Sequence, residues 1–82
     1  MNMPPLKSFK RLDVRPLIQA GEELLPKILA TIARLSPGEG LLVTAPFLPS
    51  PLIEKLAGEG FASKVERGSG ADWMVYFWRE NG

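Results

Sequence analysis

The sequence predicts a two-layer α/β sandwich, in which two helices cover one face of a small β-sheet. The chain has 82 residues, which suits one domain with a single core. The spacing of its apolar residues switches between the pattern typical of strands and the pattern typical of helices, in the order strand, helix, strand, helix, strand, strand. Two right-handed crossovers would place both helices on the same side of the sheet. We expect this domain over residues 9–80, after a flexible N-terminal arm over residues 1–8 that has little pattern.

The first half of the domain contains one strand and the longer helix. A short strand over residues 9–14 ends before Pro16, which cannot donate a backbone hydrogen bond. Apolar residues then recur at spacings of three and four as far as Leu35, which predicts an amphipathic helix. Because proline is tolerated only in the first helical turn, Pro26 places the start of this helix near Glu23.

The second half contains a buried strand, a shorter helix and a hairpin. The apolar run over residues 40–45 is bounded by turn residues and is typical of a central strand. A helix follows, with Ser50 as its predicted N-cap and Gly58 near its end. Residues 61–67 and 72–79 alternate as strands do, and the short Gly-Ser-Gly-Ala segment between them predicts a hairpin.

The composition excludes several kinds of chemistry. The chain has no cysteine and no histidine, so disulfides, thiolate or imidazole metal sites, and Ser-His or Cys-His catalytic pairs are excluded. We therefore expect no metal, no cofactor and no enzymatic activity. No apolar run approaches the ~20 residues needed to cross a membrane, and the N-terminal stretch does not resemble a signal peptide. We accordingly expect a cytoplasmic protein that does not bind membranes.

RNA binding is an alternative that the first strand suggests. Lys7, Lys10, Arg11 and Arg15 cluster in and beside it, and aromatic residues on a sheet surface can stack on bases. The C-terminal domain of the third bacterial initiation factor has a similar topology. The net charge of only +1 argues against this reading. Basic residues beside an edge strand also commonly prevent unwanted strand pairing.

The last strand is apolar on both of its faces, although the predicted helices cover only one. We therefore expect the other face to bind a protein partner or a second copy of the chain. On this interpretation, Tyr76→Lys would abolish association and leave folding intact. The alternative is partial cover of this face by the N-terminal arm, with Phe9 or Met3. The residues assigned to the open face are Met74, Tyr76 and Trp78.

A second candidate site is the turn after the first strand. Backbone N–H groups at a helix start can bind an anion, with Arg15 supplying charge and Gln19 an amide close to Gly21. Two adjacent glutamates follow and argue instead for a turn that caps itself. The proline-rich segment over residues 45–51 is expected near the same end of the sheet. A pocket between these two loops is thus the predicted place for a small ligand.

Three separated stretches carry a resemblance to a known family: "LDVRPL", "SPGEGLLVTAPFLPSPLIEKLAGEGF" and "DWMVYFW". Together they resemble the bacterial domains of unknown function called DUF2249, which are related to the TusA/SirA-like sulfur carriers. The resemblance implies a four-stranded mixed sheet in the order 1-2-4-3. Sulfur carriers of this fold have a Cys-Pro pair after the first strand, where this chain looks to have Gln19 and Ala20. Glutamine cannot form a persulfide, so sulfur transfer does not carry over.

The predicted function is therefore a non-enzymatic, cysteine-free module that binds a protein partner or a small ligand. The resemblance suggests an accessory role near redox or nitrogen-oxide metabolism. An alternative from another class is a non-covalent role in a sulfur relay, such as occupying the docking site of a carrier.

Overall fold

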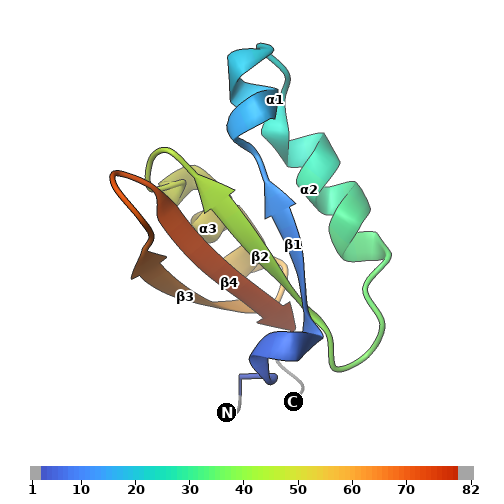
Figure 1. Cartoon of the computed structure of the whole chain (residues 1–82). Helices are drawn as coiled ribbons and strands as arrows, with labels where there is room; N and C mark the ends of the chain where they lie inside the picture. The colour runs from blue at the N-terminus through green and yellow to red at the C-terminus, as the bar shows by residue number, and fades with distance from the viewer. Residues whose placement is uncertain (1–2, 80–82) are drawn as a thin grey trace.

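The protein is described here by a computed structural model that covers residues 3–79, so residues 1, 2 and 80 of the predicted arm and domain lie outside it. A four-stranded mixed sheet has the order β1-β2-β4-β3 (Figure 1). β1 runs parallel to β2, whereas β4 is antiparallel to both β2 and β3. The predicted fold class and sheet order are confirmed. The elements are η1 (Leu6–Ser8), β1 (Phe9–Asp13), α1 (Arg15–Gln19), α2 (Leu24–Ala33), β2 (Gly40–Ala45), α3 (Ser50–Gly58), β3 (Phe61–Arg67) and β4 (Trp73–Arg79).

The first crossover contains two helices, where the sequence predicted one. Pro16 lies in the first turn of α1, where its missing N–H leaves no helical bond unmade, so this proline opens a helix as well as ending the strand. The second helix, α2, begins at Leu24 and has Pro26 in its first turn, close to the predicted start. The later helix, α3, begins at Ser50 itself, which we expected to be its N-cap.

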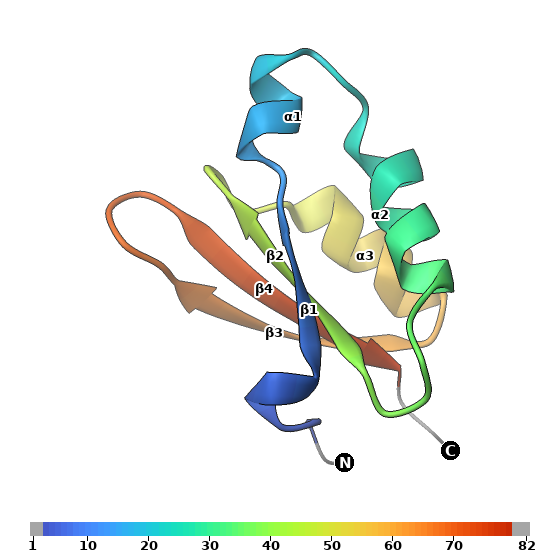
Figure 2. The ribbon, with the colours of Figure 1, turned by 45° about the vertical axis from the view of Figure 1, so that its right-hand side comes forward.

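The main core lies between the sheet and the helices α2 and α3, which cover one face (Figure 2). Ile28 of α2 and Leu56 of α3 are fully buried. They belong to the same core cluster as Val43 of β2 and Phe77 of β4, whose exposure is also 0%. Burying side chains of this size contributes about 1.5 to 3 kcal/mol each, so this layer is the main source of stability.

The opposite face of the sheet carries a second apolar cluster, formed by Phe9, Leu42, Tyr76 and Trp78, none of which is more than 9% exposed. The ring of Phe9 lies edge-on to Tyr76, with centroids 5.2 Å apart, and edge-on to Trp78 at 6.4 Å. Met3, from the segment that we expected to be a flexible arm, packs against this cluster. The structure therefore shows the alternative, cover by Phe9 and Met3, and the expectation that Tyr76 and Trp78 face a partner directly is wrong.

Gly40 leaves the space that the Phe9 ring occupies. It pairs with Phe9 on one side and with Trp78 on the other. A Cβ atom at this position would lie 2.7 Å from both the carbonyl oxygen of Phe77 and Cδ2 of Phe9. Such contacts are too short for carbon, so only glycine allows the ring to approach the strand this closely.

We expect Gly40→Ala to destabilise the protein by about 1 to 3 kcal/mol, because the new methyl group overpacks against a ring and a fixed carbonyl. Urea denaturation followed by circular dichroism measures this change. Gly58→Ala is the matched control, since nothing lies within 4 Å of a Cβ atom there. It should be neutral or stabilising by up to about 1 kcal/mol. Equal effects of the two substitutions would contradict the role given to Gly40.

Candidate functional site

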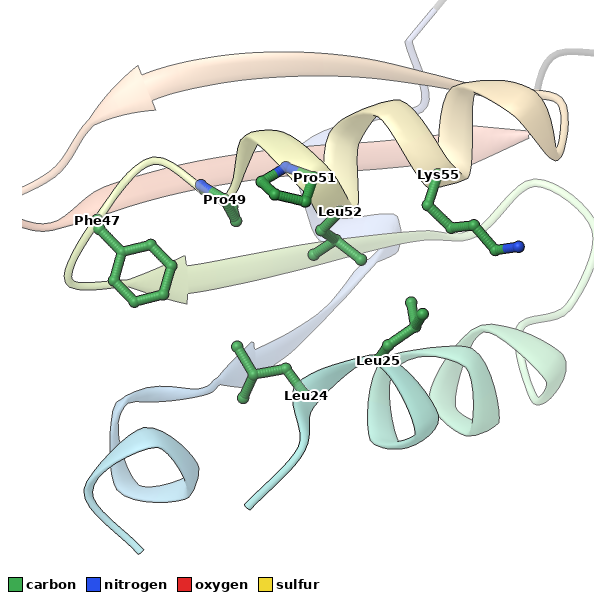
Figure 3. A pocket seen from close by; sticks show the side chains of 7 residues that line it. All are labelled: Leu24, Leu25, Phe47, Pro49, Pro51, Leu52 and Lys55. Carbon is green, nitrogen blue, oxygen red and sulfur yellow. The ribbon is translucent and has the colours of Figure 1, made fainter. Parts of the chain in front are cut away.

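An apolar groove of about 250 Å³ lies between α2 and α3 (Figure 3). One wall comes from the start of α2, and the other from α3 and the segment that precedes it. The predicted pocket beside residues 45–51 therefore exists on that side. Its opposite wall, however, is α2 and not the turn at Gln19. The groove is lined by Leu24, Leu25, Phe47, Pro49, Pro51, Leu52 and Lys55.

The β2–α3 connection holds large apolar side chains at the surface. Phe47 is 46% exposed and Leu48 is 40% exposed. Prolines at positions 46, 49 and 51 fix backbone angles around these two residues, so little conformational freedom remains to be lost when they contact a partner. The segment is thus a stiff apolar rim on one side of the groove.

The other wall is formed by α2, whose apolar side chains cover more of the helix surface than the core buries. Along α2, Ile28 faces the core and is fully buried, whereas Leu25 and Leu29 are each 37% exposed. The sequence analysis described the apolar stripe of α2 only as one side of an amphipathic helix and did not name Leu24 and Leu25 as lining residues. The signal was present, because apolar side chains at adjacent helical positions cannot all point at one sheet.

The groove has a single charged group, the ammonium of Lys55 (Figure 3). Lys55 Nζ lies 3.8 Å from Glu59 Oε2, and both side chains are about half exposed. Such a pair on the surface is weak, so Lys55 can exchange Glu59 for another carboxylate. The groove can therefore hold apolar groups with one anion at its edge. Its lining offers no nucleophile beside an acid or base.

Arg15, a predicted anion ligand, is already engaged by two carboxylates. Its Nε and Nη2 atoms donate to the two oxygens of Asp13, and its Nη1 atom donates to Asp72 Oδ2 at 2.6 Å. Hydrogen bonds from Arg15 hold the pKa of Asp13 below its ordinary value, and Asp13 in turn raises the pKa of Arg15. This cluster, which we call the arginine clamp, joins the end of β1 to the β3–β4 hairpin.

Gln19 and Gly21 lie at the C-terminal end of α1, where the backbone amides are used. The N–H groups of residues 20–22 donate to carbonyls within α1. Gly21 has a φ of 74°, the left-handed conformation that ends helices. The free amides expected beside Gln19 are therefore absent from this part of the described chain. Arg15, at the opposite end of α1, does not complete an anion site with them.

The predicted partner face is closed at its aromatic residues and only partly buried at Met74. Burial raises the pKa of Tyr76, and the nearby carboxylate of Glu66 adds to this shift. The Tyr76 hydroxyl donates to Glu66 at 3.3 Å. Because Tyr76 and Trp78 are almost fully buried, with the ring of Phe9 packed perpendicular to both, they are not displayed for stacking on bases.

Two further observations concern residues 3–79 as a whole. Within this range, no three Asp or Glu side chains come together in a way that could hold a metal ion. Among the helices described, none has the length and apolar character required to cross a membrane.

A family described as "Uncharacterized conserved protein (DUF2249)" matches residues 11–79, which run from β1 to the last residue of β4. No curated protein and no solved structure matches the chain.

We expect Tyr76→Lys to destabilise the protein by about 2 to 4 kcal/mol, because it buries a charge and removes a packed ring. Tyr76→Phe is the control. It loses only the long hydrogen bond to Glu66 and should cost less than about 1 kcal/mol. Urea denaturation of both variants measures the difference. A Tyr76→Lys variant as stable as the wild type would show that Phe9 does not close this face.

The arginine clamp should make stability depend on acid pH through Asp13. The folded pKa of Asp13 lies below its ordinary value of 3.8, so its contribution is complete above that value and is lost as pH falls through the lower folded pKa. Thermal unfolding between pH 7 and pH 2, roughly the span in which carboxylates titrate, measures this loss. Asp13→Asn should lose less stability than the wild type below pH 4. Identical pH profiles would contradict the assignment.

Proposed function

We propose that this chain, which belongs to the DUF2249 family, is a non-enzymatic protein-interaction module that binds its partner in the groove between α2 and α3. One observation carries the proposal. Of six large apolar residues exposed within residues 3–79, four lie on α2 or on the β2–α3 connection, and two of these four, Leu25 and Phe47, line the groove. Apolar residues gathered at one site favour a binding surface, whereas single ones scattered over a surface need no explanation. These four are Leu25, Leu29, Phe47 and Leu48.

The groove favours a protein segment over a small ligand. Its one polar side chain gives little to fix the orientation of a small molecule. A groove between two helices suits the apolar face of an amphipathic segment. We infer that the partner presents two or more apolar side chains with a carboxylate that reaches Lys55.

The proposal also includes a cellular setting. We place the protein in the bacterial cytoplasm, as an accessory to redox or nitrogen-oxide metabolism, and the support is the family resemblance. The relation to the TusA/SirA-like carriers has the same support, together with the sheet order. Gln19, at the position of the carrier's cysteine, does not line the groove. A non-covalent sulfur-relay role would therefore use a different surface from the one proposed.

Peptide selection tests this function without a known partner. A library of displayed peptides, about 16 residues long so that four helical turns can form, is selected on the purified protein. We expect enriched peptides with apolar residues at helical spacing and at least one acidic residue. Their affinity, measured by fluorescence anisotropy, should fall on the order of tenfold in Leu25→Asp and in Lys55→Glu.

Leu6→Asp is the matched control, because Leu6 is 67% exposed and belongs to η1, away from the groove. It introduces the same charge and should leave peptide affinity unchanged. Equal losses in Leu6→Asp and Leu25→Asp would contradict the groove as the binding site. Selection of peptides that keep their affinity in both Leu25→Asp and Lys55→Glu would contradict it as well.

A further inference from the structure

The outer edge of β3 has no neighbour within the described chain. The order β1-β2-β4-β3 places β3 at one edge of the sheet, and Figure 1 shows no element beyond it. Ser63, Lys64 and Val65, in the middle of the strand, are exposed, and Val65 is 39% exposed although it is β-branched and apolar. An edge of this kind presents unpaired backbone N–H and C=O groups to any strand that can match it.

The charges along β3 are complementary to a second copy of the same strand. Lys64 and Glu66 lie on the same face, 3.2 Å apart, on either side of Val65. If two copies pair antiparallel about a two-fold axis at Val65, each Lys64 stands directly opposite the partner's Glu66. Residues opposite one another have Cβ atoms about 4.5 to 5.5 Å apart, so both ion pairs would form. The two Val65 side chains would meet at the axis.

Other pairings of the sheet edges are less favourable. An axis at Lys64 would oppose two lysines, and an axis at Glu66 would oppose two glutamates, and like charges in these positions are destabilising. At the other edge, an axis at Arg11 of β1 would oppose two arginines. An axis at Leu12 would oppose Arg11 to Asp13, but both oxygens of that carboxylate already accept hydrogen bonds from Arg15. The register at Val65 therefore pairs opposite charges and covers the exposed valine.

We infer that the protein forms a homodimer through antiparallel pairing of β3 with β3 of a second copy, centred on Val65. The result is a continuous eight-stranded sheet, twice the four strands of one chain. A two-fold axis perpendicular to the sheet keeps both helix layers on the same side. The two α2–α3 grooves would then open on one face of the dimer and could engage a partner with two binding segments. The contact is narrow, so association should be weak.

Sedimentation equilibrium, with protein from roughly 10 μM to 1 mM, where weak pairs associate, tests the inference. We expect a monomer–dimer equilibrium. Lys64→Glu should weaken it on the order of tenfold or more, because it creates two pairs of facing glutamates. The double variant Lys64→Glu with Glu66→Lys restores opposite charges in the same register and should restore the dimer. Lys27→Glu, on the exposed side of α2, makes the same change in net charge and should have no effect.

Cysteine cross-linking tests the register separately, because the chain has no cysteine of its own. Under mild oxidation Val65→Cys should form a disulfide-linked dimer in high yield, since the two sulfurs meet at the axis. Ser63→Cys should form little, since residue 63 would face the partner's residue 67. A monomer at all concentrations, a failed charge-swap rescue or equal cross-linking at the two positions would overturn the inference. A dimer that is lost in Leu25→Asp but kept in Lys64→Glu would also overturn it.

Discussion

The packing of Phe9 over Gly40 is the contact on which the two-sided burial of this sheet depends. The helices cover one face, and residues 3–79 supply no third layer for the other. The ring of Phe9, from the edge strand, packs against Tyr76 and Trp78 and covers that second face together with Met3. The ring can approach the strand this closely only if the residue beneath it has no Cβ atom. The phenylalanine at position 9 therefore requires the glycine at position 40, which is 31 positions away.

With that face closed, most of the exposed large apolar side chains of residues 3–79 lie on the helix side of the molecule. There the apolar stripe of α2 is wider than the core can use, and the proline-fixed connection before α3 holds Phe47 and Leu48 outward. These exposed side chains lower solubility and do not belong to the core. A binding role therefore explains their presence better than a role in folding does. In the arginine clamp, by contrast, the guanidinium of Arg15 is engaged by Asp13 and Asp72 within the chain, so its role is structural.

The order of the strands and of the two longer helices could be predicted from the sequence, because the spacing of apolar residues and the turn residues report local structure directly. The short helix α1 was missed. The assignment of the two faces of β4 was also predicted correctly from alternation. The burial of the second face of β4 was not predicted, because it depends on Phe9. This residue is far away in sequence and reaches its place only through the parallel pairing of β1 with β2. The same limit applied to Arg15, whose partner Asp72 lies 57 residues away. Only one wall of the groove was predicted, namely the proline-rich segment before α3. The wall formed by α2 was not predicted, because its apolar spacing was interpreted only as a sign of a helix.

The position of β4 has a consequence for synthesis on the ribosome. β4 is the last strand of the sheet in sequence, yet it lies inside the sheet, between β2 and β3. It supplies Val75 and Phe77 to one core cluster and Tyr76 and Trp78 to the other. Before this strand emerges, β2 and β3 have no neighbour in common and neither apolar layer can close. The nascent chain therefore cannot complete either apolar layer until β4 has been synthesised, and both layers stay partly exposed up to that point.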